Sequence, residues 1–127
     1  MNKNKSLGIY GEKTAIKFLE SKGYKILTKN YRCKIGEIDI IAADGDTLSF
    51  VEVKTRSSDK YGLPGEAVNY NKQIKIVKTA LHYITKNRLT KWMSRFDIVE
   101  ILVNEDNSIN SIELLKDAFQ YSGNLGY

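Results

Sequence analysis

Residues 36–56 read GEIDIIAADGDTLSFVEVKTR, and this stretch decides the fold. Two apolar segments, 35–43 and 47–55, surround the tripeptide Asp44-Gly45-Asp46. An Asp-Gly turn between two β-prone segments is a strong signal for a hairpin. We therefore expect two antiparallel strands that carry charged residues among their apolar ones.

Further helices and strands are predicted around this hairpin. Helical spacing of apolar residues and continuous apolar runs indicate two helices, three more strands and one loop. These are helices over 8–22 and 66–87, strands over 24–31, 95–103 and 109–115, and a loop over 57–65. The order α-β-β-β-α-β-β predicts an α/β fold with a mixed sheet flanked by helices. The 127 residues fit one domain, expected over 1–119 and followed by a flexible tail over 120–127.

The composition favours a soluble protein with a polyanionic partner. Lys+Arg 20 exceed Asp+Glu 15, so the net charge is +5, which suits nucleic acid or an anionic membrane surface. A single Cys excludes an internal disulfide, and one Cys with one His is too few for a usual zinc site. No secretory signal and no membrane-length apolar run is present. We expect a cytoplasmic protein that does not bind a membrane.

Charged residues of the hairpin gather on one face. Side chains alternate along a strand, so Glu52 and Lys54 point the same way. A two-residue turn at Asp44-Gly45 places Asp39 diagonal to Glu52, and a shift of two residues places it directly opposite. Asp39, Glu52 and Lys54 share a face in both registers, whereas a shift of one residue separates them. The prediction therefore depends on the length of the turn.

Two interpretations of this charged face stay open. Close carboxylates repel each other in a partly dry site unless a cation lies between them. Mg²⁺ is commonly held by one or two carboxylates, water and phosphate oxygens. Lys54 could then orient an attacking water or stabilise charge on phosphorus. Alternatively, the face is solvated and carries a cross-strand Glu–Lys pair worth about 0.2–1 kcal/mol.

Two further carboxylates occupy positions where the pattern favours apolar residues. On a helical wheel, Glu12 falls within the apolar stripe of Ile9, Ala15 and Leu19, where a carboxylate loses solvation unless it is paired. Alternatively, Glu12 lies at an edge in a frayed first turn or pairs with a nearby lysine. Asp97 interrupts an otherwise apolar strand, and we interpret it as a buried structural carboxylate.

Several motifs resemble a known family. They are NYRC at 30–33, GEIDIIA at 36–42, FVEVKTR at 50–56, YGLPGEAVNYNKQ at 61–73 and RFDIV at 95–99. In this order they resemble the YraN-like family of uncharacterised bacterial proteins, over roughly residues 6–119. That family is similar to the PD-(D/E)xK nucleases, which include restriction enzymes and archaeal Holliday-junction resolvases. The resemblance implies a restriction-endonuclease-like fold.

The resemblance also implies roles for individual residues. The implied catalytic set is Glu12, Asp39, Glu52, Lys54 and Gln73. The three carboxylates of that set, Glu12, Asp39 and Glu52, would hold Mg²⁺ or Mn²⁺. Lys54 would position the attacking water. Ile38 precedes the motif Asp, where the name of the superfamily has Pro.

The expected activity is hydrolysis of nucleic-acid phosphodiesters, directed by structure on branched DNA, with DNA favoured over RNA. The candidate phosphate contacts are Arg32, Lys34, Arg56, Lys72, Lys75 and Lys78. For Lys72, Lys75 and Lys78 the alternative is a solvated helix face. A symmetric homodimer would bring two sites to two strands. The competing functions are a nucleic-acid-binding adaptor that does not cut and a protein-interaction subunit that keeps the fold.

Overall fold

A computed structural model describes residues 3–57 and 69–120. Its elements are α1 (Lys3–Ser21), β1 (Lys25–Arg32), β2 (Glu37–Asp44), β3 (Thr47–Ser57), α2 (Tyr70–Lys86), β4 (Met93–Val103) and β5 (Ile109–Leu115). The predicted order of helices and strands is confirmed.

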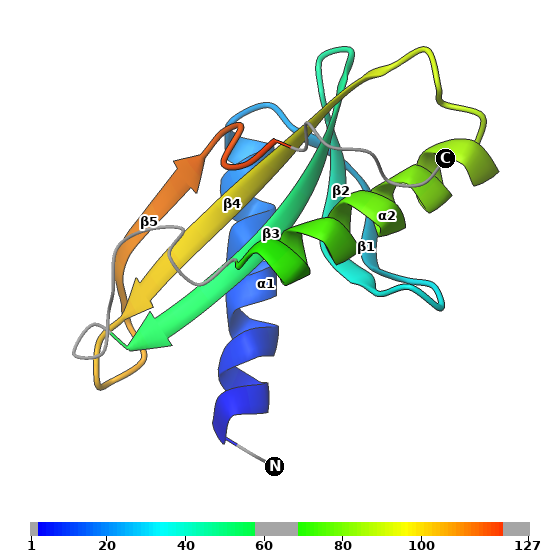
Figure 1. Cartoon of the computed structure of the whole chain (residues 1–127). Coiled ribbons are helices and arrows are strands. Elements are labelled where there is room, and N and C mark those ends of the chain that lie inside the picture. Colours follow the sequence, from blue (N-terminus) through cyan, green and yellow to red (C-terminus); the bar gives the residue numbers. More distant parts are fainter. Residues whose placement is uncertain (1–2, 58–68, 121–127) are drawn as a thin grey trace.

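The strands form one mixed sheet between the two helices. Five strands lie in the order β1-β2-β3-β4-β5. Only β3 and β4 pair in parallel among these neighbours, and α2 lies in the crossover that joins them, as a parallel connection requires. In Figure 1, α1 lies behind the sheet and α2 in front of it. This arrangement is consistent with the restriction-endonuclease-like fold that the resemblance implied.

Each face of the sheet carries its own apolar core. Phe50 and Ile98 pack with α2 on one face, whereas Val51 and Val99 pack with α1 on the other. The central strands β3 and β4 are therefore covered on both faces, which explains their nearly continuous apolar sequence. Since Phe50 faces α2, the alternation along β3 directs the side chain of Glu52 to the same face.

Two helix starts differ from the prediction. α1 begins at Lys3, five residues before the predicted start at 8, because a polar first turn gives no apolar periodicity to read. α2 begins at Tyr70, after Asn69 at its N-cap, and the Asn69 side chain accepts a hydrogen bond from the Lys72 backbone N–H at 2.9 Å. The predicted helical residues 66–68, the loop from 58 and the tail from 121 lie outside the described residues.

A glycine brings α1 close to β3. A Cβ atom added at Gly11 would lie 1.9 Å from Oγ1 of Thr55, so the two backbones approach closely only because this side chain is absent. Ala15 and Leu19 continue the buried line of α1. Ile9 is 42% exposed, so its predicted place in that line is wrong. Glu12 is half-buried and flanks the line beside Gly11.

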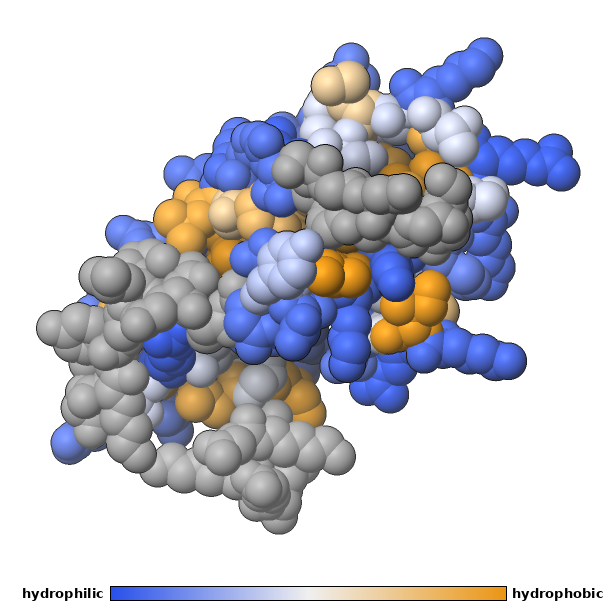
Figure 2. Space-filling view, viewed as in Figure 1, coloured by the Kyte–Doolittle hydropathy of each residue, from blue (hydrophilic) through white to orange (hydrophobic). Residues whose placement is uncertain are grey.

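The surface is mainly hydrophilic on the face viewed in Figure 2. Blue hydrophilic residues cover most of its coloured area, and the orange apolar residues form several separate patches. Among residues 3–57 and 69–120, no helix is long and apolar enough to cross a membrane.

Candidate active site

The hairpin brings Asp39 and Glu52 to neighbouring positions. The ladder between β2 and β3 ends at the pair Ile40 and Val51, and the next step in the same register is Asp39 and Glu52. This is the second of the two predicted registers. The turn contains Gly45 with φ 63°, a left-handed conformation that two-residue hairpin turns demand at their first central position.

The two strands separate at Asp39. Oδ2 of Asp39 accepts a hydrogen bond from the backbone N–H of Val53 at 2.8 Å, in place of a regular backbone pair. Ile38 and Ile41 both pack on the α2 face, whereas Ile40 packs on the α1 face. The strict alternation of side chains that the sequence predicts for this strand therefore fails around Asp39. The irregularity turns the Asp39 carboxylate towards β3.

A pocket lies where β2 and β3 separate. Its volume is about 340 Å³, within the usual range for small-ligand sites. It is lined by Leu7, Gly8, Glu12, Asp39, Glu52, Val53, Lys54 and Thr55. The four side chains that the sequence singled out from one helix and two strands therefore line one pocket.

Asp39 is a half-buried carboxylate that lies beside another carboxylate. Burial and the charge of Glu52 raise its pKa to about 7, and the charge of Glu12 adds to this. The hydrogen bond from the Val53 N–H opposes the shift without cancelling it. Burial disfavours the charged form, and a neighbouring carboxylate disfavours it further. A cation at this position would relieve both effects.

Two lysines face Glu52. Nζ of Lys72, from α2, lies 2.7 Å from Oε1 of Glu52, and Nζ of Lys54 lies 3.6 Å from the same oxygen. Burial, followed by the nearby Lys72, lowers the pKa of the Lys54 ammonium. Burial is the largest single influence on Lys72 and would lower its pKa, but the hydrogen bonds to Glu52 and Lys54 and the charges of Glu52 and Asp39 together outweigh it, so the pKa is raised. Lys54 is thus the ammonium that more readily gives up its proton.

The donor set fits a hard divalent cation held by two carboxylates. Within the described part of the chain, no three acidic, His or Cys residues are grouped closely enough to hold a metal ion together. Asp39 and Glu52 supply oxygen ligands, and Mg²⁺ typically completes such a pair with water and substrate phosphate. The role of Glu12 as a third ligand stays a prediction, although its charge acts on Asp39.

The remaining predicted site residues are not among the described residues that line this pocket. Gln73 is half-buried on α2. Arg32 forms an exposed ion pair with Glu37, Nε to Oε2 3.0 Å. A terminal nitrogen of Arg56 is buried and has no hydrogen-bond partner among the described residues. The other residues predicted to contact phosphate are exposed or half-buried. They are Lys34, Lys75 and Lys78.

The contact between Lys72 and Glu52 was not predicted from the sequence, which indicated Lys72 only as a candidate phosphate contact. The sequence nevertheless contains a feature that points to such a contact. Lys72 follows Asn69 by three residues, which places it in the first turn of a helix capped by Asn69. A cation there opposes the helix dipole, so a partner carboxylate could have been sought.

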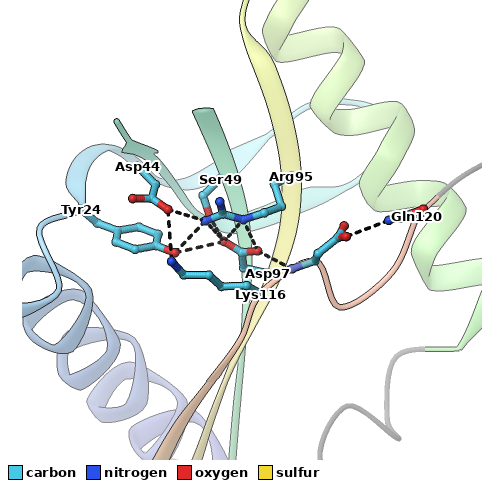
Figure 3. A network of polar contacts seen from close by, with 8 residues as sticks. Tyr24, Asp44, Ser49, Arg95, Asp97, Lys116 and Gln120 are labelled. Carbon is cyan, nitrogen blue, oxygen red and sulfur yellow. Dashed lines mark hydrogen bonds and ion pairs between the residues drawn. The ribbon is translucent and has the colours of Figure 1, made fainter. Parts of the chain in front are cut away.

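A second acidic cluster lies on the α1 face of the sheet, around Asp97. Its carboxylate accepts hydrogen bonds from the Ser49 hydroxyl, from Arg95 Nε at 2.8 Å and from the backbone N–H of Asp117 at 2.9 Å. The Tyr24 hydroxyl lies 3.4 Å away. Figure 3 shows these side chains converging from different segments. Asp97 is fully buried and fully partnered, so its interpretation as a structural carboxylate is confirmed.

Two cations, Arg95 and Lys116, balance the charges of Asp97 and Asp44. Arg95 also reaches Asp44 at 2.8 Å, and this hydrogen bond is the main cause that lowers the pKa of Asp44. The hydrogen bond from Arg95 to Asp97 is the main cause that raises the pKa of the guanidinium. Burial, followed by the charge of Asp97, raises the pKa of Tyr24 to about 12. This cluster ties β4 to the segment between α1 and β1, to β2 and β3, and to the segment after β5, and each of its acids is paired.

A larger pocket of about 670 Å³ lies at the hairpin-turn end of the sheet. Leu27, Leu89 and Trp92 line it together with Lys25. No acidic residue is among its described lining. Its size alone is a weak argument for chemistry, whereas the smaller pocket combines carboxylates, lysines and a perturbed pKa. We therefore take the smaller pocket as the candidate site.

The sheet, its two covering helices and the acidic pocket define an α/β protein of restriction-endonuclease-like architecture. Comparison with known proteins gives the family. The model of the uncharacterised protein family UPF0102 matches residues 11–101. The chain belongs to this family, which confirms the YraN-like resemblance.

Relatives of the chain match it over most of its length. A UPF0102 protein of Clostridium tetani is 52% identical over 117 residues, which cover 92% of this chain and 96% of the relative. A UPF0102 protein of Syntrophus aciditrophicus is 51% identical over 120 residues, covering 94% and 93%. These names state a family and no activity.

Proposed function

We propose that the chain is a metal-dependent nuclease that hydrolyses phosphodiesters of nucleic acids at the pocket between β2 and β3. The observation that carries the proposal is the pairing of Asp39 and Glu52 in a pocket where burial and mutual repulsion raise the pKa of Asp39 to about 7. Structural acids are normally partnered, as Asp97 is. A half-buried acid that faces another acid suits a cation site.

The residues of the pocket divide the chemistry among them. A bound Mg²⁺ or Mn²⁺ would supply Lewis acidity for the phosphodiester and lower the pKa of a water molecule. Asp39 and Glu52 would bind that ion. Lys54, on the same face as Glu52 and with a lowered pKa, would orient the attacking water and take up or share its proton. The apolar contacts of β3 hold both Glu52 and Lys54 in fixed directions.

We further propose DNA as the substrate, with branched or other structured DNA preferred, in the cytoplasm. The net charge of +5 supports a polyanionic partner, and backbone contacts supply affinity without sequence preference. A domain of this size offers little additional surface for base recognition. A symmetric dimer would allow two pockets to act on two strands.

The experiment is a cleavage assay with matched variants. Purified wild type, Asp39→Asn and Lys54→Met are incubated with Mg²⁺ or Mn²⁺ and end-labelled single-stranded, duplex, flap and four-way-junction DNA, and with RNA. Asp46→Asn serves as the control, because Asp46 is exposed in the hairpin turn and does not line the pocket. Wild type and control should cut, and EDTA should stop both.

Each pocket variant should lower the rate by about 100-fold or more, as loss of a catalytic acid–base or electrostatic group does. The preferred substrate in the panel identifies the subclass of nuclease. Equal cutting by wild type and Asp39→Asn would place the activity elsewhere. No cutting, together with salt-sensitive binding that survives both substitutions, would favour an adaptor that binds nucleic acid without cutting it.

A further inference from the structure

Lys72 occupies an unfavourable position for a cation. It lies in the first turn of α2, where the Asn69 side chain accepts a hydrogen bond from its backbone N–H at 2.9 Å. The next residue, Gln73, donates its backbone N–H to the Asn69 carbonyl at 2.9 Å. The backbone of Lys72 is therefore fixed, and its charge lies at the positive end of the helix dipole. The lysine needs a partner outside its own helix.

That partner is the oxygen atom that a metal ion would use. Lys72 Nζ lies 2.7 Å from Oε1 of Glu52, and Lys54 Nζ lies 3.6 Å from the same atom. The side chain of Glu52 is only 11% exposed, so this oxygen is largely shielded from water. A divalent cation that binds Glu52 must compete with the ammonium of Lys72, since both are attracted to one carboxylate.

The two lysines differ in how freely their ammonium groups can move away from Glu52. The Lys54 side chain is 18% exposed and that of Lys72 is 39% exposed. Lys54 extends from a central strand that is packed on both sides. Lys72 extends from the first turn of α2 and carries a long, rotatable side chain. Lys72 can therefore move into solvent or to a ligand while its backbone stays in place.

We propose that Lys72 is an internal counter-ion that exchanges partners: its ammonium neutralises Glu52 while no divalent cation is bound, and it moves to a phosphate of the nucleic acid when a cation takes Glu52. This inference rests on the proposed function and adds a regulating residue to it. Metal binding releases Lys72, and phosphate binding to Lys72 releases Glu52. By thermodynamic reciprocity, each ligand then strengthens the binding of the other.

The first test measures the binding of Mn²⁺ alone by isothermal titration calorimetry. Lys72→Met keeps the length of the side chain and removes the competing charge, so it should bind Mn²⁺ about tenfold more tightly than wild type, a typical size for such coupling. Lys72→Arg keeps the charge and should bind as wild type does. Lys86→Met controls for net charge, because Lys86 is an exposed residue in the last turn of the same helix.

The second test measures duplex binding by fluorescence anisotropy, in EDTA and in Ca²⁺, a hard cation that takes oxygen ligands. In EDTA, Lys72→Met and wild type should bind the duplex with similar affinity, because Lys72 is held by Glu52. In Ca²⁺, wild type should gain more affinity than Lys72→Met. An equal loss for Lys72→Met in both conditions would overturn the exchange, since Lys72 would then contact DNA regardless of Glu52.

The outcomes separate this inference from the proposed function. Wild type that binds Mn²⁺ and cuts DNA, beside a Lys72→Met variant with unchanged Mn²⁺ affinity, overturns the exchange and keeps the nuclease. Tighter Mn²⁺ binding by Lys72→Met without any cutting supports the exchange and overturns the nuclease. Wild type and Lys72→Met that both fail to bind Mn²⁺ overturn both.

Discussion

Asp97 and Asp39 are carboxylates of the same sheet with opposite surroundings. Asp97 is fully buried, and it accepts hydrogen bonds from Ser49, Arg95 and the backbone of Asp117. Asp39 accepts a hydrogen bond from the Val53 N–H, and its neighbouring side-chain partner is another carboxyl group, that of Glu52, which raises its pKa. Both interrupt apolar strands in the sequence, so the sequence pattern alone does not distinguish them.

The difference shows how partners distinguish a structural acid from a candidate ligand. Buried polar groups are almost always satisfied, and unsatisfied ones carry a free-energy penalty that a fold retains only with compensation. The partners of Asp97 make it a support for the fold. Burial beside the charge of Glu52 makes the ionised Asp39 a destabilising residue, which a bound cation would convert into a stabilising one. Substitutions at the two positions should therefore have opposite effects.

The largest effect is expected at Asp97. Asp97→Ala removes the acceptor for Arg95, Ser49 and the Asp117 N–H, and it should lower the free energy of unfolding by about 3–5 kcal/mol, as does breaking a buried ion pair from one side. Urea unfolding followed by circular dichroism measures the change. Asp46→Asn in the exposed turn should stay within about 0.5 kcal/mol of wild type. A similar small change at Asp97 would show that its network contributes little.

A smaller loss is expected where α1 meets β3. Gly11→Ala places a Cβ atom 1.9 Å from Oγ1 of Thr55, and such overpacking should reduce stability by about 1–3 kcal/mol. Gly8→Ala is the matched control, because nothing lies within 4 Å of its added Cβ. That variant should gain about 0.5–1 kcal/mol through helix propensity. If both alanines stabilise the protein, the close approach of α1 to β3 is wrong.

Asp39→Asn should stabilise the protein, and the gain should depend on pH. The pKa of Asp39 is raised from 3.8 to about 7 in the folded chain, so the unfolded state binds fewer protons between these values. The wild type therefore loses stability as pH rises from about 4 to 7. Asn retains the acceptor for the Val53 N–H without the charge. In EDTA at pH 8, Asp39→Asn should be about 1–2 kcal/mol more stable than wild type, less than the roughly 4 kcal/mol of the full shift, because solvent screens the half-buried carboxylate.

The pH series provides its own control. At pH 4 Asp39 is protonated in the folded wild type, so the two proteins should have nearly equal free energies of unfolding. Titrating groups that do not interact with Asp39 cancel in the difference, whereas Glu52 and Glu12, whose charges act on Asp39, contribute to it. A difference that stays constant between pH 4 and pH 8 would show that the pKa of Asp39 is not raised.

The sequence predicted the sheet and the pocket well because both depend on local alternation. The apolar residues around Glu52 and Lys54 on β3 fixed their face, and the Asp-Gly turn restricted the register to two choices. The two registers differ by one residue in the position of the turn. The observed pair Ile40 and Val51 identifies the second register. Local pattern is sufficient where each side chain alternates regularly.

Tertiary contacts explain what could not be predicted. The break in alternation at Asp39 arises where β2 leaves β3, and no local pattern signals it. The contact between Lys72 and Glu52 joins residues on separate elements, and the place of Glu12 depends on the contact between Gly11 and Thr55. Such pairs follow from packing of the helices on the sheet, which periodicity does not specify.

The most direct test asks whether a divalent cation supplies what Asp39 lacks. The free energy of unfolding is measured for wild type and Asp39→Asn at pH 8, each in EDTA and in Mg²⁺ at ten times its dissociation constant for wild type. Wild type should gain about 1.4 kcal/mol from Mg²⁺ by mass action, and Asp39→Asn should gain almost nothing. If Mg²⁺ stabilises neither protein, or stabilises both equally, Asp39 and Glu52 do not form a metal site.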